Sequence, residues 1–89
     1  MIEIEILTSP GCTGCDKAKK IVSDFVETKR NIFEGLTWKI TDLVEHPELV
    51  SKYGIMSTPA VVINGKLEFV GVPKEKKLFE RIEQHAKGK

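Results

Sequence analysis

The chain of 89 residues has neither a long hydrophobic run nor an excess of charge of one sign. Lys and Arg number 14 and Asp and Glu 13, which leaves a formal net charge of +1. A nucleic-acid-binding domain normally carries a clustered basic patch, and a membrane-spanning helix needs about 20 consecutive apolar residues. We therefore expect neither a nucleic acid nor a membrane among the partners of this chain.

Cysteine is also scarce, because the chain contains only two. Two thiols are too few for the disulfide scaffold of a small secreted domain. The first eight residues, MIEIEILT, alternate apolar and acidic side chains, whereas a secretory signal begins with positive charge and continues with an unbroken apolar segment. We therefore expect a cytoplasmic protein, in which a close pair of cysteines is catalytic or metal-binding rather than structural.

The amino-terminal part of the chain predicts a strand followed by a helix. Alternating isoleucine and glutamate side chains predict a strand over residues 2–8, with Glu3 and Glu5 on its solvated side. A helix is predicted over residues 14–30, because apolar side chains recur there with helical spacing. These side chains are Ala18, Ile21, Val22, Phe25 and Val26.

The middle of the chain predicts two shorter elements. Residues 36–43 are interpreted as a second strand, with Trp38 and Ile40 on one face. Residues 46–54 are predicted to form a short helix, because a proline suits its first turn and a glycine suits its end.

The last third of the chain predicts a hairpin and a closing helix. The dipeptide Asn64-Gly65 is a strong signal for a two-residue turn, so we expect a hairpin over residues 58–71 with strands at 61–63 and 67–70. The final helix is predicted over residues 72–87. Its expected buried stripe is Leu78, Phe79, Ile82 and Ala86.

The predicted elements follow the order β-α-β-α-β-β-α. Because a long helix separates the first two strands, we expect those strands to be parallel with a right-handed crossover. The pattern therefore predicts an α/β fold over residues 1–89, a single domain in which helices cover both faces of a four-stranded mixed sheet.

Both cysteines lie in the segment SPGCTGC, residues 9–15. Their spacing suits a metal clamp, a structural cross-link or a redox pair. The start of a helix presents free N–H groups and the positive end of the helix dipole, and this setting lowers the pKa of a cysteine. Cys12 would lie on the loop side, where a partner can reach it, and Cys15 in the first turn. We therefore interpret Cys12 as the attacking thiolate and Cys15 as the resolving thiol.

The Cys-x-x-Cys turn, together with a later Thr58-Pro59 that opens a hairpin, resembles the thioredoxin fold. The segments HPELVSKYGIMSTPAVVINGK and FVGVPKEKKLFERI are similar to the matching parts of thioredoxins. The length is that of a glutaredoxin, so the chain looks like the short thioredoxin/glutaredoxin-like proteins of archaea. The resemblance implies a thiol–disulfide oxidoreductase that needs no cofactor.

The resemblance also implies roles for individual residues. Cys12 and Cys15 would be catalytic, and a cis peptide bond would precede Pro59, which would pack against the cysteines. Thr58, Pro59 and Gly71 would bind the substrate, with the backbone of Thr58 pairing with an extended substrate segment.

The motif differs from that of thioredoxins in two ways. Thioredoxins have Trp before the first cysteine and Gly-Pro between the two, whereas this chain has Gly11 before it and Thr13-Gly14 between them. Thioredoxins also carry a buried acid in the strand that leads to the motif. Here that part of the strand is Ile6 and Leu7.

Two alternatives to a thioredoxin-like reductase stay open. A glutaredoxin would use glutathione, although residues 71–74, GVPK, differ from the usual glutathione-binding turn. A non-enzymatic module could hold a soft metal such as Cu(I), but a cysteine pair is only half of a tetrahedral zinc site. We interpret His46 and His85 as solvated helix residues, and we expect no bound metal.

Apolar residues near the cysteines indicate the kind of partner. Ile55, Met56 and Val72 suit a protein surface better than a small charged tripeptide, although Met56 could equally serve packing. We therefore expect a monomer that reduces protein disulfides and receives electrons from a flavin-dependent thioredoxin reductase.

Overall fold

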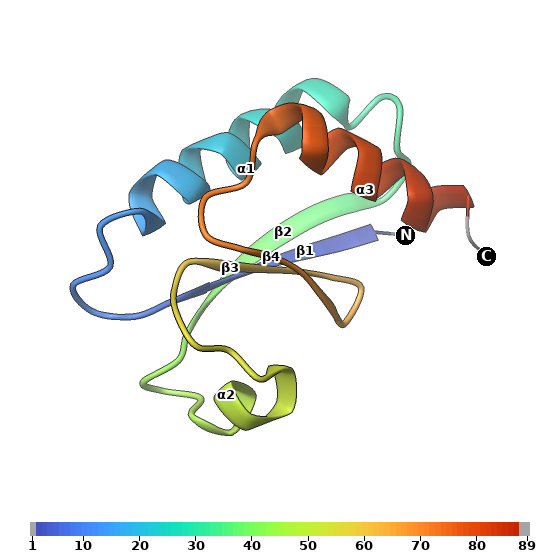
Figure 1. Cartoon of the computed structure of the whole chain (residues 1–89). Helices are drawn as coiled ribbons and strands as arrows, with labels where there is room; N and C mark the ends of the chain where they lie inside the picture. The colour runs from blue at the N-terminus through green and yellow to red at the C-terminus, as the bar shows by residue number, and fades with distance from the viewer. Residues whose placement is uncertain (1, 88–89) are drawn as a thin grey trace.

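The computed structural model describes residues 2–87 and consists of a four-stranded sheet with helices on both faces (Figure 1). Helices α1 and α3 cover one face, and the short helix α2 lies on the other. The elements are β1 (Ile2–Thr8), α1 (Cys15–Lys29), β2 (Leu36–Asp42), α2 (Glu48–Tyr53), β3 (Ala60–Ile63), β4 (Lys66–Val70) and α3 (Glu75–Lys87). The predicted order and the mixed sheet are confirmed. The single domain is predicted over residues 1–89, and residues 1 and 89 lie outside the described residues.

The sheet has the strand order β2-β1-β3-β4. Strand β1 is parallel to β2 and antiparallel to β3, and β3 is antiparallel to β4. Strand β3 is apolar and buried throughout, because both faces of the sheet are covered there, whereas β1 also carries Glu3 and Glu5. None of the helices in residues 2–87 combines the length and the apolar character needed to cross a bilayer.

The predicted turn at Asn64-Gly65 is confirmed. Both residues have positive φ, 51° and 83°, as a type I′ turn requires. Asn64 also ties the turn to the start of β1, because the Glu3 N–H donates to Asn64 Oδ1 over 2.9 Å and the Asn64 N–H donates to the Glu3 carbonyl over 3.0 Å. The hairpin is therefore held to β1 at its tip as well as along β3.

The core is divided by the sheet into two clusters. The larger cluster lies under α1 and α3 and contains an aromatic group, Phe25, Phe33 and Phe79, whose ring centroids are 5.7–6.5 Å apart. The smaller cluster faces α2. Its buried members are Leu7, Leu43, Ile55, Ala60 and Val62.

All three predicted helices begin later than the sequence suggested, α1 by one residue and the other two by more. Helix α2 starts at Glu48 rather than residue 46, because the preceding residues turn back on Asp42: the Val44 N–H donates to the Asp42 side chain and the His46 N–H to its carbonyl. Helix α3 starts at Glu75 rather than residue 72. The earlier residues of that segment belong to the cysteine site described below.

Two apolar residues of the predicted elements, Ile40 and Ala86, are exposed, although the helical pattern places Ala86 in a buried stripe. Ile40 is 45% exposed, although Trp38 on the same face of β2 packs against the larger cluster. Strand β2 is an edge strand, so it has no neighbour on its outer side. Ala86 is exposed in the last turn of α3, beyond the buried Ile82.

The aromatic group predicts the effect of a core truncation. Phe25 is fully buried and contacts both other rings, so Phe25→Ala should lower the free energy of unfolding by about 3–5 kcal/mol. The control is Ile32→Ala, because Ile32 is 60% exposed. A truncation at the surface should change the free energy of unfolding by no more than about 0.5 kcal/mol. Urea unfolding measures both values, and equal losses in the two variants would contradict the assignment of the core.

Candidate active site

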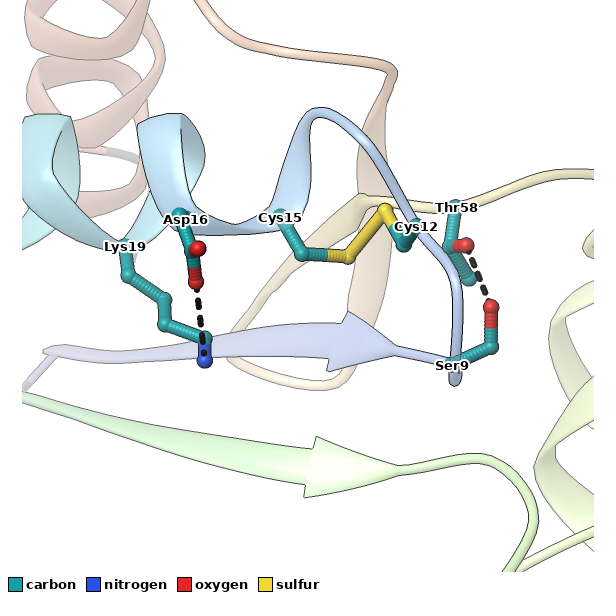
Figure 2. The surroundings of a disulfide bond; sticks show 6 residues. All are labelled: Ser9, Cys12, Cys15, Asp16, Lys19 and Thr58. Atoms are coloured by element: carbon teal, nitrogen blue, oxygen red, sulfur yellow. Dashed lines mark hydrogen bonds and ion pairs between the residues drawn. A yellow bond between two sulfur atoms is a disulfide. The ribbon is translucent and has the colours of Figure 1, made fainter.

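Cys12 and Cys15 form a disulfide at the amino end of α1 (Figure 2), with their Cα atoms 5.6 Å apart. Cys15 is the first residue of α1 and is only 5% exposed. Cys12 lies in the loop between β1 and α1 and is half-buried. Cys12 is therefore the more exposed of the two cysteines.

The loop that carries Cys12 makes a tight turn at the end of β1. Gly11 has φ +76°, a conformation that a residue without Cβ adopts without strain. The Cys12 N–H then donates to the Ser9 carbonyl over 3.3 Å. Gly14 precedes α1 and caps it without a side-chain hydrogen bond, and its carbonyl accepts from Ala18 over 3.0 Å. Gly11 thus serves the turn that brings Cys12 to the amino end of α1.

The segment before β3 lies beside the disulfide. The Thr58–Pro59 peptide bond is cis, as predicted. Figure 2 shows the Thr58 side chain directed at Ser9, and the two hydroxyl oxygens are 2.7 Å apart. The Pro59 carbonyl accepts a hydrogen bond from the Gly71 N–H over 2.6 Å. The site is therefore built from three segments, which begin at Ser9, Thr58 and Gly71.

At Gly14 the segments of Pro59 and Val72 leave no room for a side chain. A Cβ placed on Gly14 would lie 2.9 Å from Val72 Cγ2 and 3.3 Å from Pro59 Cδ. Distances this short require the neighbours to move. Gly14 has φ −98°, so the restriction is one of space and not of backbone conformation. This contact places Pro59 against the segment between the two cysteines.

Few charges lie close to the disulfide. Asp16 in the first turn of α1 is 98% exposed in its side chain and pairs with Lys19 over 3.5 Å (Figure 2). The strand beneath the motif is apolar, because Ile6 and Leu7 are fully buried. The sequence therefore correctly indicated that no acid lies in that part of β1.

The expectation that both glutamates of β1 are solvated is half wrong. Glu3 is exposed and pairs with Lys39 over 3.7 Å. Glu5 is half-buried, and its carboxylate accepts a hydrogen bond from the Thr41 hydroxyl on β2. Parallel pairing puts Thr41 beside the acid, and a spacing pattern within one strand does not reveal that partner.

An apolar groove of about 330 Å³ adjoins Ser9 and Thr58. Leu43 and Ile55 are its buried members, and the exposed Val44, Val50 and Met56 complete its lining. Met56 is 93% exposed, so of the two roles that the sequence leaves open for it, packing is excluded and partner contact stays. On the other side of Pro59, Val70 and Val72 are exposed as well. The site is thus flanked on two sides by apolar surface.

The two histidines have different surroundings. His46 is exposed, precedes α2, and lies 3.4 Å from Glu48. His85 is half-buried in α3 and lies 2.7 Å from the Glu68 carboxylate, so its interpretation as a solvated residue is wrong. Within residues 2–87, no three His, Cys, Asp or Glu side chains come together in a way that could hold a metal ion.

The sequence did not indicate the roles that two residues play in the site. Ser9 forms a hydrogen bond with the Thr58 side chain, and Gly14 leaves the space in which Pro59 and Val72 pack. A signal for both was present, because residues 9–15 are almost entirely small. Small residues indicate close approach but not the identity of the approaching group, which comes from more than 40 positions away in the chain.

Comparison with known proteins agrees with this geometry. A family model described as a thioredoxin domain matches residues 2–83. A thioredoxin from Methanocaldococcus jannaschii is 35% identical over 83 residues, which is 93% of this chain and 94% of that protein. A probable thioredoxin from Methanothermobacter thermautotrophicus is 35% identical over 82 residues, covering 92% and 93% of the two chains. The crystal structure of a protein disulfide oxidoreductase from Aeropyrum pernix is 29% identical and superposes with a TM-score of 0.77, over 99% of this chain and 38% of that one.

The contact at Gly14 predicts the outcome of a double substitution. Gly14→Ala should lower the free energy of unfolding by about 1–3 kcal/mol, since the added methyl group overpacks the junction. Val72→Ala removes the nearest atom, Val72 Cγ2, so the double variant should lose less than the sum of the single losses. Urea unfolding of the four proteins gives this coupling. Thr13→Ala at an exposed position is the control, and additive losses at Gly14 and Val72 would show that the contact is absent.

Proposed function

Because the chain belongs to the thioredoxin family and is a thiol–disulfide oxidoreductase, we propose that Cys12 is its attacking thiolate and Cys15 its resolving thiol. The difference in burial carries this proposal. A substrate disulfide must reach the attacking sulfur, and Cys12 lies in the loop while Cys15 is buried in the first turn of α1. The resolving sulfur only has to reach Cys12, which the existing disulfide supports.

The reaction proceeds by two thiol–disulfide exchanges. The Cys12 thiolate attacks one sulfur of the substrate disulfide, so that a mixed disulfide forms and the other substrate sulfur leaves as a thiolate. The Cys15 thiolate then attacks Cys12, which forms the Cys12–Cys15 disulfide and releases the second substrate thiolate. The substrate gains two electrons and, from solvent, two protons. A reductase returns two electrons to the enzyme and restores its dithiol.

The start of α1 supports the thiolate at Cys12. The first turn of a helix has N–H groups without partners in the helix, and the dipole places partial positive charge there. Helix α1 has 15 residues, long enough for this field to be developed. Negative charge on the Cys12 sulfur is therefore favoured without an acid or base in contact with it.

The proposed substrate-binding residues are Thr58, Pro59 and Gly71, with protein disulfides as the substrates. The apolar surface on both sides of these residues supports this assignment. Docking a protein would remove that surface from water, which favours the complex. The exposed side chains concerned are Val44, Val50 and Met56 on one side and Val70 and Val72 on the other.

The electron donor that fits this surface is a flavin-dependent thioredoxin reductase, acting on a cytoplasmic monomer. Glutathione would need a cradle for its carboxylates beside Gly71. The residues that follow are the apolar Val72 and Pro73, and a proline has no backbone N–H to donate. Neither the family model nor the archaeal relatives support the glutathione-dependent or the soft-metal alternative.

The division of roles predicts opposite behaviour of two serine variants. Cys15→Ser should accumulate a mixed disulfide with a protein substrate, because Cys12 can attack but the intermediate is not resolved. Cys12→Ser should lose turnover and form no such adduct. Non-reducing electrophoresis with mass spectrometry detects the adduct. If Cys12→Ser formed the adduct instead, the roles would have to be exchanged.

The proposed donor predicts the source of electrons in steady-state turnover. Insulin reduction should be fast with NADPH and a flavin-dependent thioredoxin reductase, and at least about 10-fold slower with glutathione and glutathione reductase, since the site lacks an anion cradle. Val72→Glu tests the apolar surface in the same assay and should slow the reductase reaction. A glutathione rate equal to or above the reductase rate would make the glutaredoxin alternative correct.

A further inference from the structure

Strand β4 contains one residue more than its pairing with β3 requires. Val61 pairs with Phe69 and Val62 with Leu67, and the register shifts between these two pairs. Glu68 therefore lies opposite no residue of β3. This is a β-bulge, in which two residues of one strand oppose one residue of the other and the following side chains are redirected.

The bulge changes the face to which the end of β4 belongs. In a regular strand Leu67 and Phe69 would lie on the same face, because side chains alternate with a period of two. Here Leu67 packs against the smaller cluster on the α2 side, and Phe69 packs against the larger cluster under α1 and α3. Glu68 is also directed at α3, as its contacts show.

The carboxylate of Glu68 is held by two side chains from α3. Arg81 Nη1 lies 3.0 Å from Glu68 Oε1, and His85 Nε2 lies 2.7 Å from Glu68 Oε2. Arg81 and His85 are four positions apart, so they lie on one side of the helix. The Glu68 side chain is only 4% exposed. A buried carboxylate that loses its partners is strongly unfavourable. The contacts with Arg81 and His85 therefore keep Glu68 as the bulged residue of β4.

The register after the bulge determines what reaches the disulfide site. Val70 pairs with Ala60, and the next residue, Gly71, donates its N–H to the Pro59 carbonyl. Val72 then packs against Gly14 between the cysteines. A shift of one residue would bring a different amide to Pro59 and would direct the side chains to the opposite faces. Gly71, with φ +101°, could not be replaced there by a valine without strain.

We propose that Glu68, clasped by Arg81 and His85, is a positioning residue for disulfide exchange. By fixing the bulge it places Gly71 and Val72 against Pro59 and Gly14, where a protein substrate docks. The proposal rests on the proposed function in one respect, namely that this junction binds the substrate. Neither Arg81 nor His85 contacts the disulfide, and their effect passes through the backbone of residues 68–72.

The test compares Glu68→Gln with Glu80→Gln. Glutamine keeps the size of Glu68 but carries no charge, so the hydrogen bonds of Arg81 and His85 are no longer made to a carboxylate and are weakened. Glu80 is an exposed acid on α3, the helix that carries Arg81 and His85. Its substitution therefore controls for the loss of one negative charge. Each protein is reduced with dithiothreitol and desalted, and its single-turnover oxidation is followed with insulin and with a small aromatic disulfide.

For Glu68→Gln we expect the insulin concentration at half-maximal rate to rise about 10-fold with little change in the maximal rate, because docking and not exchange is impaired. The rate with the small disulfide should stay within about 2-fold of the unmodified protein, because that substrate does not need the docking surface. The Gly71 amide should exchange with deuterium about 10-fold faster relative to the amides of β1. Glu80→Gln should change none of these values.

Unchanged Gly71 exchange and unchanged insulin concentration dependence in Glu68→Gln would overturn the proposal, even if the variant is less stable. If Glu68→Gln does not fold, His85→Asn removes one of the two contacts and should shift both readouts in the same direction by less. An unmodified protein that cannot reduce insulin would refute the proposed function instead, and the Gly71 exchange would then decide the present inference alone.

Discussion

The disulfide site depends on the pairing of β1 along both of its edges. On one side β1 pairs with β2 from Ile2 to Thr8, and on the other with β3 from Ile4 to Leu7. A strand held on both edges, with most of its side chains buried, cannot slip, because a slip of one residue would move every side chain to the opposite face. Leu7 pairs with Ala60, so the end of β1 meets the beginning of β3. The cysteine loop that follows β1 is thereby brought to the Thr58–Pro59 segment that precedes β3.

Once these two segments are adjacent, the rest of the site consists of two hydrogen bonds and close packing rather than ion pairs. The shortest distances join the Gly71 amide to the Pro59 carbonyl and the Ser9 hydroxyl to the Thr58 hydroxyl. The closest packing is beside Gly14, where a side chain would not fit. Apolar side chains surround this junction on two sides. Such a site leaves the chemistry to the two sulfurs and the helix end, while the surroundings determine which molecules can approach.

The sequence predicted those features that arise from local patterns. The strands, the turn at Asn64-Gly65 and the cysteine pair all depend on neighbouring residues, and the structure has them in the predicted places. The errors have a different origin. The local pattern around His85 predicts a solvated side chain, because nothing in it reveals the partner Glu68, which is 17 positions away and lies in a bulge. After a bulge, the side chains of a strand lie on the face opposite to the one that regular alternation predicts. No characteristic turn residue marks the bulge here, so periodicity alone does not locate it.

The disulfide spans only three positions of the chain, and this has a thermodynamic consequence. It links no distant elements, so a loop of this size closes readily in the unfolded chain as well, and the unfolded protein has its own dithiol–disulfide equilibrium. Folding and oxidation then form a closed cycle of four states. Each 30 mV by which folding raises the reduction potential makes the dithiol form about 1.4 kcal/mol more stable relative to the disulfide form. The difference in unfolding free energy between the two redox forms therefore measures how far the fold itself tunes the couple.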